Sequence, residues 1–211
     1  MKKLTLILVV SLFSFIGVVQ AQTYADTQAY SLNEDTGNLF FIDYTIAFPS
    51  KNISDFVDPT SYRGFSMDFR HLLSDNFSVG FTTGFQSFYE DKGVKDTYMN
   101  DATLHGHTYH YLYSVPIFVN GHYYMNMDGK LKPFVGIGIG TIYNNMETRV
   151  GGISEDNKYW QFAIAPEIGL MYKVNDYMGA QVRGTADMAF ESGDYDSGTY
   201  YRLHIGLYYN F

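Results

Sequence analysis

The sequence predicts an all-β protein, namely an eight-stranded antiparallel transmembrane up-and-down β-barrel. Eight segments alternate apolar and polar residues with a period of two, as strands with one apolar face do. Long and short connections alternate between these segments, which is typical of outer-membrane barrels. The 20 Tyr, 17 Phe and 1 Trp residues suit two aromatic girdles at the membrane surfaces.

The last twelve residues, 200–211, show the alternation most clearly. One face carries the apolar and aromatic residues Tyr201, Leu203, Ile205, Leu207, Tyr209 and Phe211. The other face carries Arg202 and His204 among smaller or polar residues. No later helix covers the apolar face. A strand between lipid outside and a polar interior needs this arrangement, so we expect it to close the barrel.

The amino terminus resembles an export signal. Lys2 and Lys3 precede the apolar run 4–19, and small residues Val19 and Ala21 flank a cleavage-like site. We therefore predict a signal peptide over 1–21, a periplasmic N-terminal tail over 22–37 and the barrel over 38–211. The alternative is an uncleaved anchor, although the apolar run is shorter than the ~20 residues of a spanning helix. The chain has no Cys, which excludes disulfides.

The first four strands are predicted from alternating apolar residues at 38–48, 62–72, 77–89 and 110–125. Pro49 ends the first strand and opens a loop over 49–61. A tight turn at 73–76 joins the second and third strands, because it contains good turn residues. The polar segment 90–109 is predicted to be a long loop.

The last four strands are predicted on the same grounds at 131–144, 159–174, 177–190 and 200–211. A strongly marked turn at 126–129 precedes the fifth strand. Residues 145–158 and 191–199 are predicted to be long loops, and 175–176 a minimal turn. An even number of strands places both ends of the barrel on the periplasmic side.

Pro116 and Pro166 fall inside predicted strands, where a closed barrel has no free edge to tolerate a missing N–H. We expect a β-bulge at each proline.

Charged residues in the middle of the predicted strands all point inward. A charge that faces lipid at mid-depth costs ~2–4 kcal/mol, which explains the segregation. We interpret the inward residues as a salt-bridge network that fills the lumen, since eight strands leave room only for side chains. The alternative is a narrow, gated ion path. The cluster comprises Asp43, Asp68, Arg70, Glu167, Arg183, Asp187, Arg202 and His204, and we expect Asp43 to lie close to Arg202 or His204.

Three histidines, His105, His107 and His110, occur within six residues and could bind a divalent metal. No Cys or fixed carboxylate supports them, so we favour a solvated aromatic loop and predict no metal and no cofactor. The glycines at 136, 138 and 140 lack a following helix, which argues against a nucleotide site. We expect them to make room for large interior side chains.

No spacing of residues in the sequence indicates a catalytic site. Ser114 or Ser192 near His110 could be imagined as a pair, but we predict no catalysis. The net charge of −8 without a basic cluster argues against nucleic acid. The acidic, tyrosine-rich loops could bind an extracellular ligand or could simply be solvated.

Segments 111–119 and 132–140, together with the terminal strand, resemble the outer-membrane-protein β-barrel domain family, which includes small barrels of the OmpX, OmpA and OmpW type. The resemblance implies a monomer in the cell outer membrane that contacts membrane lipid. It also implies that Leu207, Tyr209 and Phe211 form the signal read by the barrel-assembly machinery. We expect a structural or surface-interaction role without catalysis. The alternative is a small porin-like barrel that passes a small or apolar solute.

Overall fold

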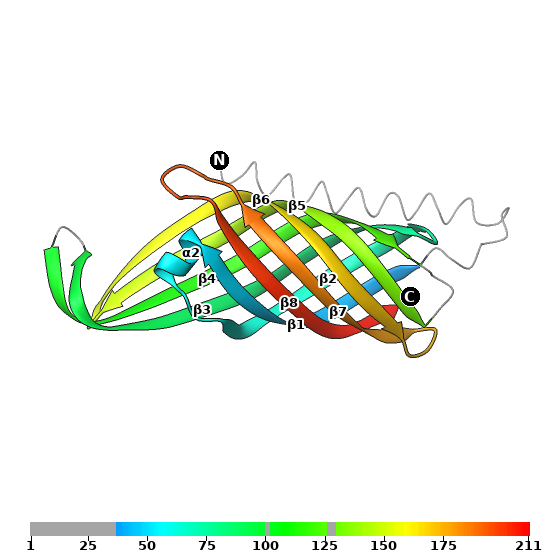
Figure 1. Cartoon of the computed structure of the whole chain (residues 1–211), viewed down its shortest axis with the longest axis horizontal. Helices are drawn as coiled ribbons and strands as arrows, with labels where there is room; N and C mark the ends of the chain where they lie inside the picture. Colours follow the sequence, from blue (N-terminus) through cyan, green and yellow to red (C-terminus); the bar gives the residue numbers. More distant parts are fainter. Residues whose placement is uncertain (1–36, 100–101, 126–129) are drawn as a thin grey trace, which may run out of the picture. The chain divides into compact units, whose positions relative to one another are not determined.

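The computed structural model describes residues 37–99, 102–125 and 130–211, so the predicted signal peptide and all but the last residue of the predicted tail lie outside the described residues. Eight antiparallel strands form a closed barrel in which each strand pairs with its neighbours in sequence (Figure 1). Strand β1 also pairs with β8 from Leu39 to Lys51. The predicted fold class is therefore confirmed.

All strands except β7 extend further toward the long connections than the sequence predicts. Their bounds are β1 Asn38–Lys51, β2 Ser61–Ser74, β3 Phe77–Met99, β4 Ala102–Tyr124, β5 Leu131–Val150, β6 Ile153–Lys173, β7 Met178–Ala189 and β8 Gly198–Asn210. A short helix, α2 (Asn52–Phe56), lies in the connection from β1 to β2. No helix in the described part of the chain is long and apolar enough to cross a membrane.

Two predicted loops, 90–109 and 145–158, are wrong, because both segments continue as paired strands. The β3–β4 pairing runs to Met99 and Ala102, and the β5–β6 pairing runs to Val150 and Ile153. The β3–β4 hairpin extends furthest from the rest of the barrel (Figure 1). Polar composition suggested loops there, but cross-strand backbone bonds hold these segments as strands.

The prediction of a bulge at each proline is also wrong. The β3–β4 register is the same on both sides of Pro116, and the β6–β7 register is the same on both sides of Pro166. Each proline interrupts the pairing with one neighbouring strand but does not shift its register. A missing N–H removes a hydrogen bond without requiring an extra residue in the strand. The register shifts that do occur lie between Thr45 and Ala47, Leu72 and Ser74, and Asp91 and Gly93.

The outer wall is apolar and ringed by aromatic side chains at both ends. Tyr143 and Trp160 pack together near the loop side with ring centres 5.0 Å apart. Phe77 and Tyr123 do the same near the turn side, also at 5.0 Å. Large apolar side chains between these levels are exposed, among them Ile139, Phe162 and Ile205. Such a surface is suited to lipid hydrocarbon rather than to water.

Candidate functional site

Arg183 lies inside the barrel and binds three carboxylates. Its Nη1 lies 2.9 Å from Glu167 Oε2 and 3.1 Å from Asp68 Oδ2, and its Nη2 lies 3.2 Å from Asp43 Oδ2. All four side chains are buried. They come from β7, β6, β2 and β1, where the period-two alternation directs each of them inward. One guanidinium thus joins four of the eight strands.

A second guanidinium, that of Arg70, connects this charged layer to aromatic rings. Its Nη2 lies 2.7 Å from Asp68 Oδ2. Its guanidinium carbon lies 4.3 Å from the ring centre of Phe41 and 4.6 Å from that of Phe134. Cation–π attraction is stronger where both partners are desolvated, so these rings stabilise a fully buried charge.

Sequence reasoning missed two members of this layer, His122 and Gln181. His122 pairs through Nε2 with Glu167 Oε1. Gln181 donates from Nε2 to both carboxylate oxygens of Asp43, at 2.8 and 3.0 Å. Both residues occupy inward positions of the alternation in their strands. Counting neutral polar side chains on the inner face would have found them.

A second ion pair lies in the same lumen. Arg202 Nη1 lies 3.1 Å from Asp187 Oδ2, and Arg202 Nη2 donates to Ser114 Oγ at 3.2 Å. His204 is held by hydroxyl groups, with Nδ1 2.9 Å from Ser66 Oγ and Nε2 3.3 Å from Thr185 Oγ1.

Asp43 lies close to His204, one of the two neighbours expected from the sequence. Ser66 Oγ donates to Asp43 Oδ2 at 3.3 Å and lies 2.9 Å from His204 Nδ1, so one hydroxyl links the two side chains. The Asp43 carboxylate is bound by Arg183 of β7, whereas Arg202 pairs with Asp187.

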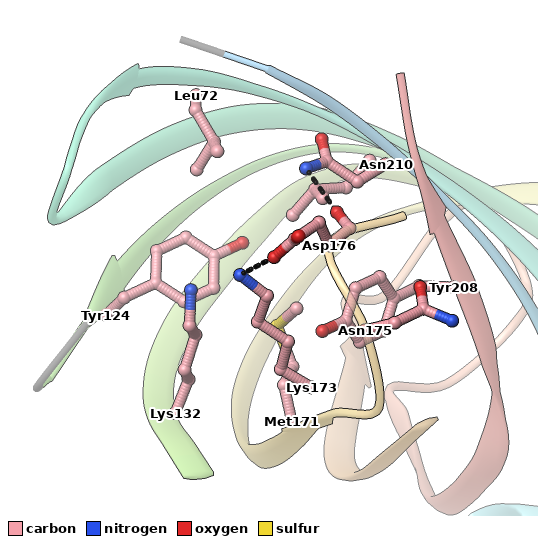
Figure 2. Close-up of a pocket in the computed structure, with 10 residues that line it drawn as sticks. Leu72, Tyr124, Lys132, Met171, Lys173, Asn175, Asp176, Tyr208 and Asn210 are labelled. Atoms are coloured by element: carbon pink, nitrogen blue, oxygen red, sulfur yellow. Dashed lines mark hydrogen bonds and ion pairs between the residues drawn. The ribbon is translucent and has the colours of Figure 1, made fainter. Parts of the chain in front are cut away.

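An apolar layer closes the lumen below the charges, on the side of the short turns. Its buried residues are Leu39, Phe41, Leu72, Tyr124, Phe134, Met171 and Tyr208. Outside it lies a pocket of only about 60 Å³, where Tyr124 and Tyr208 stand on opposite sides and Lys173 Nζ approaches Asp176 Oδ1 to 2.8 Å (Figure 2). Water therefore reaches this mouth but meets a packed floor.

A second apolar layer closes the lumen on the loop side. It contains Ala47, Ile53, Val57, Phe88, Leu112, Phe118, Ile142, Ala163, Ala165, Ala189 and Tyr200. Ile53 and Val57 belong to α2 and the residue after it, so the β1–β2 connection covers the mouth with its own side chains. Gly198 of β8 makes this possible, because a Cβ there would lie 2.5 Å from Ile53 Cδ1.

The connection that carries α2 is fastened to the β3–β4 hairpin. The Phe56 ring stacks on His110 at 4.3 Å, and His110 Nδ1 lies 2.8 Å from the Phe56 carbonyl oxygen. The Asp58 N–H donates to Glu90 Oε2 at 3.0 Å. Partial burial would raise the pKa of Glu90, but the bonds from Lys92 and the Asp58 N–H hold it below its usual value.

The prediction of a packed polar interior holds for the central layer and is wrong for both ends. A cavity within the charged layer, bordered by Arg183 and His204 among others, measures about 20 Å³, which is room for about one water. Apolar side chains at the ends exclude water from the ion pairs between them. This arrangement can hold the strands together through buried ion pairs.

The three candidate metal ligands do not converge. His105 Nδ1 lies 2.7 Å from Asp96 Oδ1, and His107 Nδ1 lies 3.1 Å from Asp91 Oδ1. His110 lies on the opposite face of β4, against Phe56. Over the ranges that the structure describes, no three His, Cys, Asp or Glu side chains gather as metal ligands would.

The structure does not bring Ser114 or Ser192 into hydrogen-bond contact with His110. Ser114 is buried against Arg202, whereas His110 is bound to the carbonyl of Phe56. Ser192 lies in the β7–β8 connection, where its N–H bonds to the Tyr195 carbonyl.

The inward glycines of β5 serve two purposes. A Cβ at Gly136 would lie 2.6 Å from Glu167 Oε1, which agrees with the prediction that glycine makes room for interior side chains. At Gly140, however, a Cβ would lie 2.0 Å from the backbone oxygen of Ile117. There glycine allows the close approach of two strands.

Neither a family model nor a curated protein matches the chain. Solved structures do. The attachment invasion locus protein Ail of Yersinia pestis, solved in complex with the heparin analogue sucrose octasulfate, has a TM-score of 0.53 at 9% identity over 84% of this chain and 99% of its own. Neisserial surface protein A has a TM-score of 0.57 at 14% identity, over 82% of this chain and 97% of its own. The Pseudomonas aeruginosa outer membrane protein OprG has a TM-score of 0.53 at 14% identity, over 83% of this chain and 96% of its own. The fold is thus that of a small outer-membrane barrel.

Proposed function

We propose that the protein is a closed outer-membrane barrel that anchors a two-hairpin β-extension, residues 90–110 and 145–158, at the cell surface for contacts with extracellular partners. The observation that carries this proposal is the filled lumen, in which a charged layer lies between two apolar layers. Fold alone does not assign a function, so the argument rests on what this lumen and these hairpins can do.

The hairpins support the surface role. Their strands continue past the aromatic girdle, where lipid no longer requires an apolar exterior. Tyr98 and Val94 are exposed near the end of the β3–β4 hairpin. Exposed tyrosine on a rigid scaffold is typical of recognition surfaces. Ail was solved with a sulfated sugar, but the net charge of −8 here disfavours a polyanionic partner.

The closed lumen is tested by single-channel recording of the refolded barrel in a planar bilayer. We expect stable insertion without discrete current steps. Reproducible steps from the unaltered protein would contradict the closed lumen and would favour the porin-like alternative.

The role of the hairpins is tested by a variant in which a short Asp-Gly turn replaces residues 92–107. We expect unchanged folding in detergent, measured by the gel shift between unheated and heated samples, because the barrel below keeps its strand pairing. Cells that display the shortened protein should lose attachment to coated surfaces relative to cells with the full chain. Equal attachment by both would count against the surface role.

A further inference from the structure

A groove crosses the outer wall of the barrel over β6, β7 and β8. These three strands are consecutive neighbours in the barrel (Figure 1). Its volume is about 470 Å³, and its lining is mostly apolar. The small residues Gly184 and Ala186 form its floor, and larger side chains flank them, namely Phe48, Ile168, Tyr201 and Leu203. A Cβ at Gly184 would meet nothing within 4 Å, so the floor is open to the outside.

The groove lies at mid-depth of the lipid-facing wall. Pro166, which lines it, lies midway along β6 between Trp160 and Tyr172, both of which are exposed aromatic residues at opposite ends of the wall. Acyl chains are therefore what surrounds it.

The strand pairing is interrupted at this place. Between β6 and β7 the pairs run from Ile164–Met188 directly to Glu167–Thr185, which skips Pro166 and Ala186. Phe190 donates its N–H to the Phe162 carbonyl at 2.9 Å, so every second residue of β7, including Ala186, directs its backbone groups toward β6. Pro166 has no N–H to give to the Ala186 carbonyl.

The side chains beside this gap do not replace the missing donor. At the Pro166 gap, Pro166, Gly184 and Ala186 carry no side-chain donor. The hydroxyl of Thr185 lies instead 3.3 Å from His204 Nε2. A carbonyl without a donor is costly in hydrocarbon, so a donor from outside the chain would stabilise it.

We propose that this groove binds one acyl chain of a membrane lipid that carries a hydroxyl group near its middle, with the hydroxyl donating to the Ala186 carbonyl. The apolar band of an outer-membrane barrel is ~25 Å tall, so a donor at its centre must sit about ten carbons from the headgroup. A hydroxyl close to the headgroup would not reach the Ala186 carbonyl. This inference concerns the outer wall and does not depend on the surface role proposed above.

The test is native mass spectrometry of the barrel released from bilayers that contain equal amounts of phosphatidylcholine with a 12-hydroxystearoyl chain and with a stearoyl chain. We expect the hydroxylated lipid to be enriched about three- to tenfold in the lipid-bound barrel, which corresponds to one net hydrogen bond. Equal retention of the two lipids would overturn the proposal, because the groove would then be ordinary lipid-contacting wall.

The variant Gly184→Leu fills the groove and should return the lipid ratio to that of the bilayer. Gly121→Leu is the matched control, since Gly121 is a glycine of β4 whose added Cβ would also meet nothing within 4 Å. It should keep the enrichment. Folding of each variant is checked by gel shift, and Ala186→Leu replaces Gly184→Leu if the latter does not fold. Enrichment that survives filling of the groove would place the lipid elsewhere and contradict the assignment.

Discussion

The side chain on which the lumen most depends is that of Arg183, because three buried carboxylates share it. Arg70 neutralises part of the same layer through Asp68. Removing one partner of a buried ion pair leaves uncompensated charge in a medium of low dielectric. The energetic consequence is larger here than at an exposed pair, where water replaces the lost partner.

The substitution Arg183→Met therefore has a predictable result. It keeps much of the side-chain volume but leaves Asp43 and Glu167 without their shared cation. We expect the free energy of unfolding in urea to fall by about 3–5 kcal/mol. The matched control is Arg63→Met, because Arg63 is exposed on β2, and this change should have little effect. If both variants unfold alike, the charged layer does not hold the barrel together.

The short helix α2 covers the loop-side opening of the lumen. Its five residues cannot form a stable helix by themselves. Burial of Ile53 among apolar side chains of the lumen, together with the bonds to His110 and Glu90, holds the connection in place. The position of this connection is thus set by contacts with strands that lie far from it in sequence.

A charge at the buried position of this element should release it. We predict that Ile53→Asp increases the rates of proteolysis and of amide hydrogen exchange over residues 53–58, because a carboxylate cannot stay in the apolar layer. Ile153→Asp is the control, since Ile153 is 45% exposed at the start of β6. An unchanged exchange rate in Ile53→Asp would mean that the connection is held without this apolar contact.

The barrel as a whole is closed where its two ends meet. Asn38 and Phe211 exchange backbone hydrogen bonds at 3.0 and 2.9 Å, and the Phe211 ring stacks on Tyr209 at 6.1 Å. The Phe211 side chain is nevertheless 61% exposed on the outer wall. The contribution of this side chain to packing within the protein is therefore small, so its predicted role in assembly can be tested apart from stability.

The proposed assembly signal can be separated from stability by Phe211→Ala. This change keeps the backbone bonds to Asn38, so refolding in detergent should be retained. In cells we expect several-fold less folded barrel in the outer-membrane fraction, measured by gel shift. Phe77→Ala is the control, because Phe77 is 54% exposed in the turn-side girdle. A similar loss in both variants would indicate a general need for girdle aromatics instead.

Alternation along each strand determined the fold class, the number of strands and the inward direction of the charges. Each of these follows from local chemistry, since lipid excludes charge and a strand presents alternate residues to opposite faces. The C-terminal strand and the residues of the charged layer, from Asp43 to His204, could be predicted on that basis.

Only the tertiary structure decided which charged side chains in the lumen pair with one another and where the strands end. Strand register and stagger place Arg183, and not Arg202, beside Asp43. Cross-strand bonding turned the polar segments 90–109 and 145–158 into hairpins. Contacts between distant strands made an apolar cap from Ile53 and a groove from Gly184 and Pro166. Composition and alternation in one strand carry no information about which residue of another strand lies opposite, and that pairing is what shapes the lumen and the wall.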